Sequence, residues 1–232
     1  MAEHTQIIDL YGIPACGKTT LAKYMAKHPG NGLKVATIRS CMRSALNNKW
    51  KLVRSISLKN FLASVRLKFS APIDKKRRVI SFKSVLLMGA YKNYVRKYTD
   101  YDIVVVDHGD IQSFVSLERG DNLHNSDKFK KACLQYLDAS LSTAYVYCQI
   151  DAETALRRMN NRSRDKGRID TISDQNHKLH EFNKEITCFD FWTATLKERT
   201  VTLFEIDAKE PCSKIADKLF LLLQNLRSSK IE

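Results

Sequence analysis

The sequence predicts an α/β fold, a three-layer α/β/α domain built around a five-stranded parallel sheet. Short apolar runs of strand length alternate along the chain with longer stretches whose apolar residues have helical spacing. The run 102–107 is rich in β-branched residues, which is typical of a parallel strand buried on both faces. A glycine-rich motif follows the first strand and opens the first helix. No linker rich in Pro, Gly or Ser divides the 232 residues, so we expect a single domain over 1–232.

The motif after the first strand matches the pattern G-x-x-x-x-G-K-[ST] of a phosphate-binding loop (Walker A) at every fixed position. The apolar run 7–11 before it is predicted as a buried parallel strand, and 21–28 after it as a helix, which is the context this loop requires. We expect the loop and the first helical turn to bind a nucleotide. The residues concerned are Gly12, Ile13, Pro14, Ala15, Cys16, Gly17, Lys18, Thr19 and Thr20.

The fixed positions of this loop each have a chemical role. Gly12 and Gly17 allow a tight turn that brings backbone N–H groups against phosphate oxygens, at the positive end of the following helix. Lys18 can reach the β and γ phosphates, Thr19 can place its hydroxyl on Mg²⁺, and Thr20 can hydrogen-bond an α phosphate. Cys16 is interpreted as a small loop residue, because no assisting base lies near it in the sequence. The expected cofactors are ATP and Mg²⁺.

The second strand is predicted at 34–38, and Arg39 follows at its carboxyl end. Ligands of open α/β sheets bind outside the carboxyl ends of the strands, so Arg39 is a candidate for binding the acceptor substrate. An arginine that only closes a surface loop is an equal alternative.

Residues 41–98 are predicted as a basic helical insertion between the second and third strands, with a break near 71–72. The segment holds 15 of the 39 Lys and Arg residues but only one of the 25 Asp and Glu residues, so it carries the whole net charge of +14. Such a field attracts anions, which makes an anionic acceptor or a nucleic acid a candidate partner. Its apolar residues at helical spacing are expected in the core, among them Leu58, Phe61, Leu62 and Val65.

The third strand ends in Asp107, the position of a Walker B carboxylate. Such an aspartate holds Mg²⁺, often through water, or accepts the proton of an attacking hydroxyl. Asp110 follows and competes for the same roles, including contact with the acceptor. Capping of a turn is the alternative for either residue.

An arginine-rich segment follows the fourth strand, and we expect residues 152–170 to form a mobile lid. Arg158 and Arg162 lie four residues apart on one helical face, and Arg164 follows where Gly167 suggests that the helix has ended. Guanidinium groups that converge on a transferring phosphoryl group stabilise its charge, so these three arginines are candidate catalytic residues. A solvated charged helix is the alternative.

The remaining elements complete the predicted domain. They are a packing helix at 126–141, strands at 143–150 and 200–206, a long helix at 172–196 and an amphipathic terminal helix that begins near Pro211.

Composition argues against several classes of protein. The first residues lack the basic and apolar regions of a signal peptide, and no apolar run approaches transmembrane length, so we expect no membrane partner. The six cysteines show no C-x-x-C spacing, so neither a zinc site nor a disulfide framework is expected. Reduced thiols fit a cytoplasmic location.

The chain resembles the nucleoside and nucleotide kinase group of P-loop NTPases, the deoxynucleoside kinase and thymidylate kinase families especially. The phosphate-binding loop matches. Residues 158–164 resemble the R-x-x-x-R-x-R lid of deoxynucleoside kinases, and 206–208 resemble the end of the last strand in thymidylate kinases, where the following loop lies against adenine. The resemblance implies that Arg158 helps to bind ATP and that the adenine loop consists of Lys209, Glu210 and Pro211.

Two positions depart from these families. They are expected to carry a carboxylate base just after the second strand, where this chain has Arg39-Ser40-Cys41. They also carry an Asp-Arg pair after the third strand, where this chain has Asp107-His108. Both departures concern the acceptor and leave the prediction of ATP binding unchanged.

These features predict an ATP- and Mg²⁺-dependent kinase that transfers the γ-phosphoryl group to a small, anionic acceptor, above all a nucleoside or nucleotide. One alternative is a polynucleotide 5′-kinase or another nucleic-acid-directed enzyme that binds its substrate through 41–98. Another is a nucleotide-binding switch that transfers nothing. A homodimer is compatible with the sequence.

Overall fold

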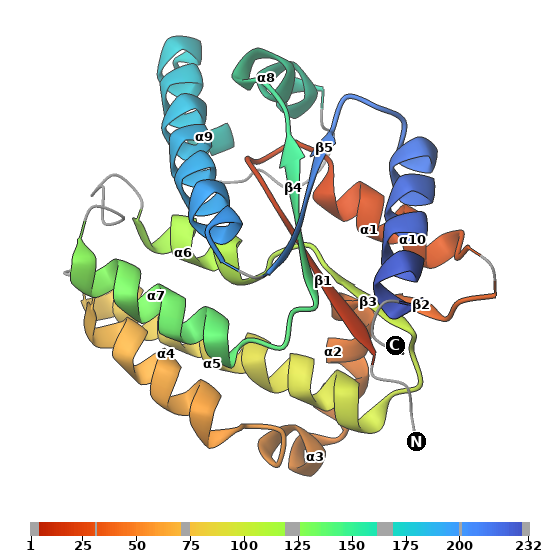
Figure 1. The fold of residues 1–232 in the computed structure, drawn as a ribbon. Helices are drawn as coiled ribbons and strands as arrows, with labels where there is room; N and C mark the ends of the chain where they lie inside the picture. The colour runs from red at the N-terminus through yellow and green to blue at the C-terminus, as the bar shows by residue number, and fades with distance from the viewer. Residues whose placement is uncertain are drawn as a thin grey trace.

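The computed structural model describes residues 5–30, 32–70, 75–118, 126–161, 169–199 and 201–228. They form a five-stranded, all-parallel sheet in the order β2-β3-β1-β4-β5 (Figure 1). The strands are β1 (Gln6–Tyr11), β2 (Val35–Thr37), β3 (Ile103–Val106), β4 (Ala144–Gln149) and β5 (Thr202–Asp207). The predicted fold class is therefore confirmed, and β1, which leads into the phosphate-binding loop, is the central strand.

Helices cover both faces of the sheet (Figure 1). They are α1 (Lys18–Lys27), α2 (Ile38–Asn47), α3 (Lys49–Val53), α4 (Leu58–Ser70), α5 (Lys75–Tyr98), α6 (Asp110–Glu118), α7 (Asp127–Ala139), α8 (Ala152–Asn160), the short 3₁₀ helix η2 (Ile169–Thr171), α9 (Gln175–Lys197) and α10 (Cys212–Ser228). On one face α1 packs against α10, whereas α5, α6 and α9 lie on the other, with α4 and α7 packed together beside them.

The sheet forms where the sequence is mostly apolar: β3 is entirely so, whereas β1 includes Gln6 and Asp9. Every residue of β1 and β3 is buried, and the two strands pair with Ile8 opposite Val105. Some helix starts are stabilised by a polar side chain at the N-cap: the Asp151 carboxylate accepts a hydrogen bond from the Thr154 N–H at 2.7 Å at the start of α8. The Thr37 hydroxyl accepts one from the Ser40 N–H at 3.3 Å at the start of α2.

The element boundary after the second strand differs from the prediction. β2 ends at Thr37 because this residue already caps α2, so Arg39 lies in the first turn of a helix and not at the end of a strand. After Asp107, α6 begins at Asp110, in a segment for which the sequence predicts no element.

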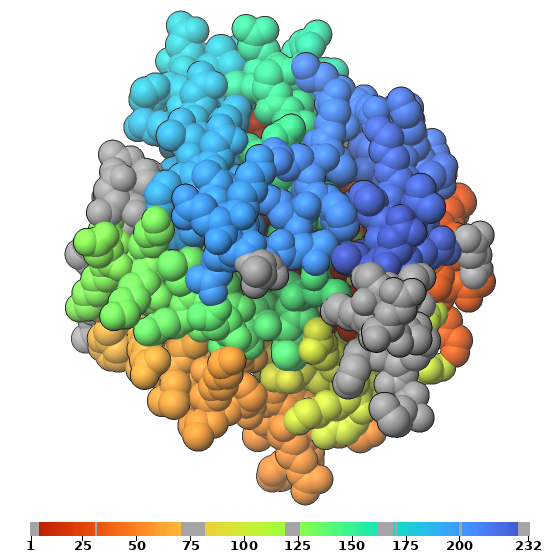
Figure 2. Space-filling view, in the orientation of Figure 1, coloured from red at the N-terminus to blue at the C-terminus, as the bar shows by residue number. Residues whose placement is uncertain are grey.

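Helix α4 is oriented against the prediction. Leu58, Phe61 and Leu62 were expected in the core, but they are 72%, 40% and 46% exposed, and Val65 is only half-buried. In Figure 2 this helix forms part of the molecular surface beside α7. Its buried side carries mostly small or polar residues, namely Asn60, Ala63, Ser64, Leu67 and Ser70.

The close approach of α4 to α5 explains this orientation. Gly89 of α5 lies so near Asn60 that a Cβ atom at position 89 would be 2.9 Å from the Asn60 Nδ2. Bulky side chains do not fit between two helices at this separation, so the helix turns its small residues inward. Helical spacing alone does not distinguish the two sides.

Two further observations concern compartment and membrane. All six cysteines are free thiols. Over the described ranges, no helix combines the length and the apolar character needed to cross a bilayer.

Two leucines of α4 test this orientation of the helix. We expect Leu67→Ala to lower the free energy of unfolding by about 2–5 kcal/mol, because it opens a cavity in the core. Leu62→Ala should lower it by less than about 1 kcal/mol, because this side chain is half in water already. Urea denaturation measures both, and the identical substitution on one helix cancels differences in helix propensity. A larger loss for Leu62→Ala would contradict the orientation.

Candidate active site

The phosphate-binding loop connects the carboxyl end of β1 to α1. Gly12 and Gly17 have φ values of +141° and +101°, a region that favours glycine. At Gly12 space forbids a side chain as well, since a Cβ atom there would lie 2.6 Å from the carbonyl oxygen of Cys148. The loop is therefore packed against the end of β4, and its glycines are required by its geometry.

Lys18 is buried and folded back onto its own loop. Its Nζ donates hydrogen bonds to the carbonyl oxygens of Gly12 at 2.6 Å and Ile13 at 3.0 Å, and lies 3.3 Å from the Sγ of Cys16. Within the described residues it forms no ion pair with a carboxylate. An anion that enters the loop therefore meets an ammonium group whose charge is balanced only by neutral carbonyl groups and one sulfur atom.

The sulfur of Cys16 has an unusual ionisation. A hydrogen bond from the Cys148 thiol lowers the pKa of Cys16 to about 5, although burial acts in the opposite direction, and the charge of Lys18 lowers it further. The ionised form of the Cys16 thiol is therefore favoured relative to that of an ordinary cysteine. The sequence suggested only a small loop residue, because nothing in it places Cys148 beside position 16.

Thr19, Arg39 and Asp107 meet at the carboxyl ends of the strands. The Thr19 Oγ1 donates to the Asp107 Oδ2 at 2.7 Å, and the Arg39 Nη2 lies 3.1 Å from the same oxygen. Asp107 is buried, whereas the Arg39 side chain is 56% exposed. A hydroxyl and a carboxylate oxygen side by side are ligands that suit Mg²⁺, so these two residues fit the predicted metal role.

A hollow of about 270 Å³ opens beside this group. Its lining combines the three residues just described with others from α1 and α2. We call it the basic hollow, and its polar lining includes Thr19, Lys23, Arg39, Ser40, Arg43 and Asp107. Sequence reasoning missed Lys23 and Arg43. A signal existed, because each follows a predicted site residue by four positions on a helix and so lies on the same side.

A second hollow of about 300 Å³ lies on the other side of the loop and is here called the Arg158 pocket. Its lining includes apolar residues from α1, β5 and α10, and also Thr20, Cys148, Arg158 and Glu210. The Arg158 Nη1 donates to the carbonyl oxygen of Ala208 at 2.9 Å, which ties α8 to the loop after β5.

The predicted adenine loop contributes less to this pocket than expected. Of its three residues Glu210 alone is in the lining; Lys209 instead pairs with Asp151, its Nζ 2.7 Å from the Asp151 Oδ2, and Pro211 opens α10 without lining the pocket. Two predicted catalytic arginines, Arg162 and Arg164, lie outside the described residues.

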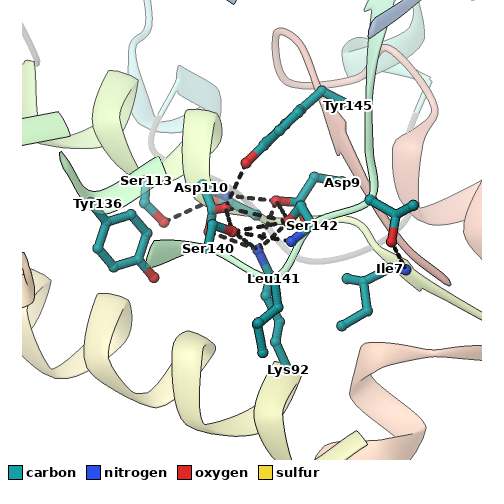
Figure 3. A network of polar contacts seen from close by, with 12 residues as sticks. Ile7, Asp9, Lys92, Asp110, Ser113, Tyr136, Ser140, Leu141, Ser142 and Tyr145 are labelled. Carbon is teal, nitrogen blue, oxygen red and sulfur yellow. Dashed lines mark hydrogen bonds and ion pairs between the residues drawn. The ribbon is translucent and has the colours of Figure 1, made fainter. Parts of the chain in front are cut away.

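Asp110 belongs to a different environment, a buried ion network (Figure 3). The Lys92 Nζ lies 2.8 Å from the Asp9 Oδ2 and 2.8 Å from the Asp110 Oδ1, and all three side chains are almost completely buried. Hydroxyl groups of Ser140, Ser142 and Tyr145 donate to the Asp110 carboxylate as well. Asp110 lines neither hollow, so the structure does not bring it together with Thr19 and Asp107.

The three charged groups of this network shift one another's pKa values. Burial raises the pKa of Asp9 to about 6, against the effect of Lys92. Burial acts to raise the pKa of Asp110, but the charge of Lys92 lowers it. Burial acts to lower the pKa of Lys92, but the two carboxylates raise it. Sequence reasoning missed Lys92, because one lysine among the 15 Lys and Arg residues of a basic segment carries no mark of burial.

The raised pKa of Asp9 makes a testable contribution to stability. The ordinary pKa of an aspartate is 3.8. Between pH 3.8 and about 6, Asp9 has therefore lost its proton in the unfolded chain but keeps it in the folded protein. We expect the free energy of unfolding of the natural protein to fall, relative to that of Asp9→Asn, as the pH rises from about 4 to about 7. Urea titrations of both proteins across this range measure the difference, and a difference that rises with pH would contradict it.

Comparison with known proteins gives matches in structure only. No protein-family model matches the sequence, and no curated protein matches it. A deoxyadenosine kinase from M. mycoides, solved with the products dCMP and a flexible dCDP, matches with a TM-score of 0.52 and 12% identity over 95% of this chain and 100% of that one. The kinase solved with bound dATP matches with a TM-score of 0.49 and 14% identity, over 94% and 99%.

At 12% identity the likeness concerns the fold alone. As a likeness of fold, it confirms the expected resemblance to deoxynucleoside kinases. The match covers 95% of this chain and 100% of the other, and in this chain the covered fold is built on the five-stranded parallel sheet. The chain therefore has the fold of a P-loop nucleoside kinase.

Proposed function

We propose that this protein is an ATP-dependent phosphotransferase of the nucleoside and nucleotide kinase type. The observation that carries the proposal is the position of the phosphate-binding loop between two hollows. Thr20 lines the Arg158 pocket and its neighbour Thr19 lines the basic hollow. Transfer of a phosphoryl group needs a donor and an acceptor held on opposite sides of the phosphates, and this arrangement supplies both places.

The donor side is proposed as follows. The base of ATP enters the Arg158 pocket, where Leu21, Ile206 and Ile215 provide apolar contact. The phosphates lie on the loop N–H groups, and Lys18 exchanges its carbonyl partners for the β and γ phosphates. Arg158, held at the edge of this pocket by Ala208, adds positive charge.

Thr19 and Asp107 are the residues that would hold Mg²⁺. Bound there, the ion would neutralise charge on the phosphates. Asp107 is favoured over Asp110 for every proposed role at the reaction centre, because Asp110 is enclosed by Lys92 and three hydroxyl groups. The solved neighbour, a deoxyadenosine kinase with dCMP and dCDP bound, supports a nucleotide ligand by analogy of fold. Free thiols support a reducing compartment such as the cytoplasm.

Substitution of the loop lysine tests the proposal. We expect Lys18→Ala to abolish ATP-dependent transfer, because the β and γ phosphates lose their cation, while the circular dichroism spectrum stays unchanged. Lys27→Ala, at the exposed end of the same helix, is the matched control and should retain full activity. Release of ADP in a coupled assay with a panel of acceptors measures both. Undiminished transfer by Lys18→Ala would refute the proposal.

A further inference from the structure

We propose that the acceptor is a phosphomonoester, and that an oxygen of its phosphate group attacks ATP. The product would then contain a new phosphoanhydride bond. This inference rests on the proposed function and specifies the acceptor for the same site. Two properties of the basic hollow lead to it: the charge of its lining and the presence, among its described lining residues, of a single carboxylate, Asp107, which is proposed to hold Mg²⁺.

The lining is strongly cationic. Lys23 comes from α1, and Arg39 and Arg43 come from α2, whose N-terminal end also opens here. Neither Lys23 nor Arg43 forms an ion pair within the described part of the chain. Asp107 is the acidic residue of the lining, and its charge is already matched by Arg39 at 3.1 Å. A neutral nucleoside would leave this positive charge unmatched, whereas a phosphate dianion would pair with it.

Besides Asp107, which is proposed to hold Mg²⁺, the described lining residues offer a hydroxyl acceptor no second carboxylate and no imidazole. A hydroxyl must lose its proton as it attacks, so a carboxylate or imidazole has to lie within reach. The Oδ2 of Asp107 is engaged by Thr19 and Arg39, and neither Asp110 nor His108 lines the hollow. A phosphate monoester has a second pKa near 6, so at neutral pH its oxygens are already ionised and need no base.

The proposed phosphoryl transfer to the acceptor phosphate requires no proton transfer. An ionised oxygen of the acceptor phosphate forms a bond to the γ-phosphorus of ATP. The bond from that phosphorus to the oxygen shared with the β phosphate breaks, and its electron pair leaves with ADP. Lys23 and Arg43 hold the acceptor phosphate, and Arg39 exchanges its contact with Asp107 for one with the same phosphate.

The test compares acceptors in pairs that differ only by phosphate. Nucleosides and their 5′-monophosphates, sugars and sugar phosphates, and oligonucleotides with a 5′-hydroxyl or a 5′-phosphate are offered with ATP. ADP release is measured, and ³¹P NMR identifies the product. We expect the phosphorylated member of at least one pair to have a kcat/KM higher by tenfold or more, and its product to show a phosphoanhydride signal.

Two variants connect the result to the hollow. Arg43→Ala should raise KM for the phosphorylated acceptor by about 10- to 100-fold, the loss expected for a hydrogen bond to a charged group. Its affinity for ATP, measured by calorimetry, should stay unchanged because Arg43 lies outside the Arg158 pocket. Arg54→Ala, an exposed arginine at the end of α3, is the matched control and should leave both values unchanged.

The outcomes separate this inference from the proposed function. Transfer to the hydroxyl of a nucleoside, a sugar or a 5′-hydroxyl oligonucleotide, with a kcat/KM equal to or above that of the phosphorylated partner, would overturn the inference and leave the kinase proposal standing. An equal rise of KM in Arg54→Ala would overturn the assignment to the hollow. Tight ATP binding without ADP release for any acceptor would overturn both proposals and favour a nucleotide-binding switch.

Discussion

A single buried ammonium group constrains much of this structure. Lys92 brings a charge into the interior, which is tolerated only because two carboxylates and several hydroxyl groups surround it. Those carboxylates belong to β1 and to the start of α6, so the lysine of α5 joins three elements that are distant in the sequence. Gly109 lies directly against the Asp9 carboxylate, where a Cβ atom would come within 2.5 Å of its oxygens. The end of β3 is thereby held in position, and with it Asp107.

On both sides of the phosphate-binding loop, a cation is held by acceptor groups of the protein. On one side Lys18 donates to two carbonyl oxygens of the loop and lies beside the Cys16 sulfur, and on the other Arg39 lies beside Asp107. Although Lys23 and Arg43 form no ion pair within the described residues, Lys18 and Arg39 are thus held in place by acceptor atoms of the protein itself. Such partners keep the charged groups oriented and lower the cost of arranging them when a ligand binds.

The sequence was sufficient for the strands and the loop, because both depend on local patterns. Buried parallel strands are short, mostly apolar runs, and the loop needs glycine where no side chain fits, as at Gly12. It was insufficient wherever a side chain's role depends on a distant partner. Lys92 appeared to be one more surface cation and Asp110 a second active-site carboxylate, yet each explains the burial of the other. The orientation of α4 likewise depends on Gly89 of another helix. Spacing along one helix contains no information about such contacts.

The outward stripe of α4 has a practical consequence. Leu58 is 72% exposed after folding, so burial of apolar surface in the single chain gains little from it, and Phe61 keeps 40% of its surface in water. Hydrophobic side chains that contribute little to the core still promote contact between molecules as the protein becomes concentrated. Solubility and thermodynamic stability are therefore determined by opposite sides of this one helix, and the first can be engineered with little change to the second.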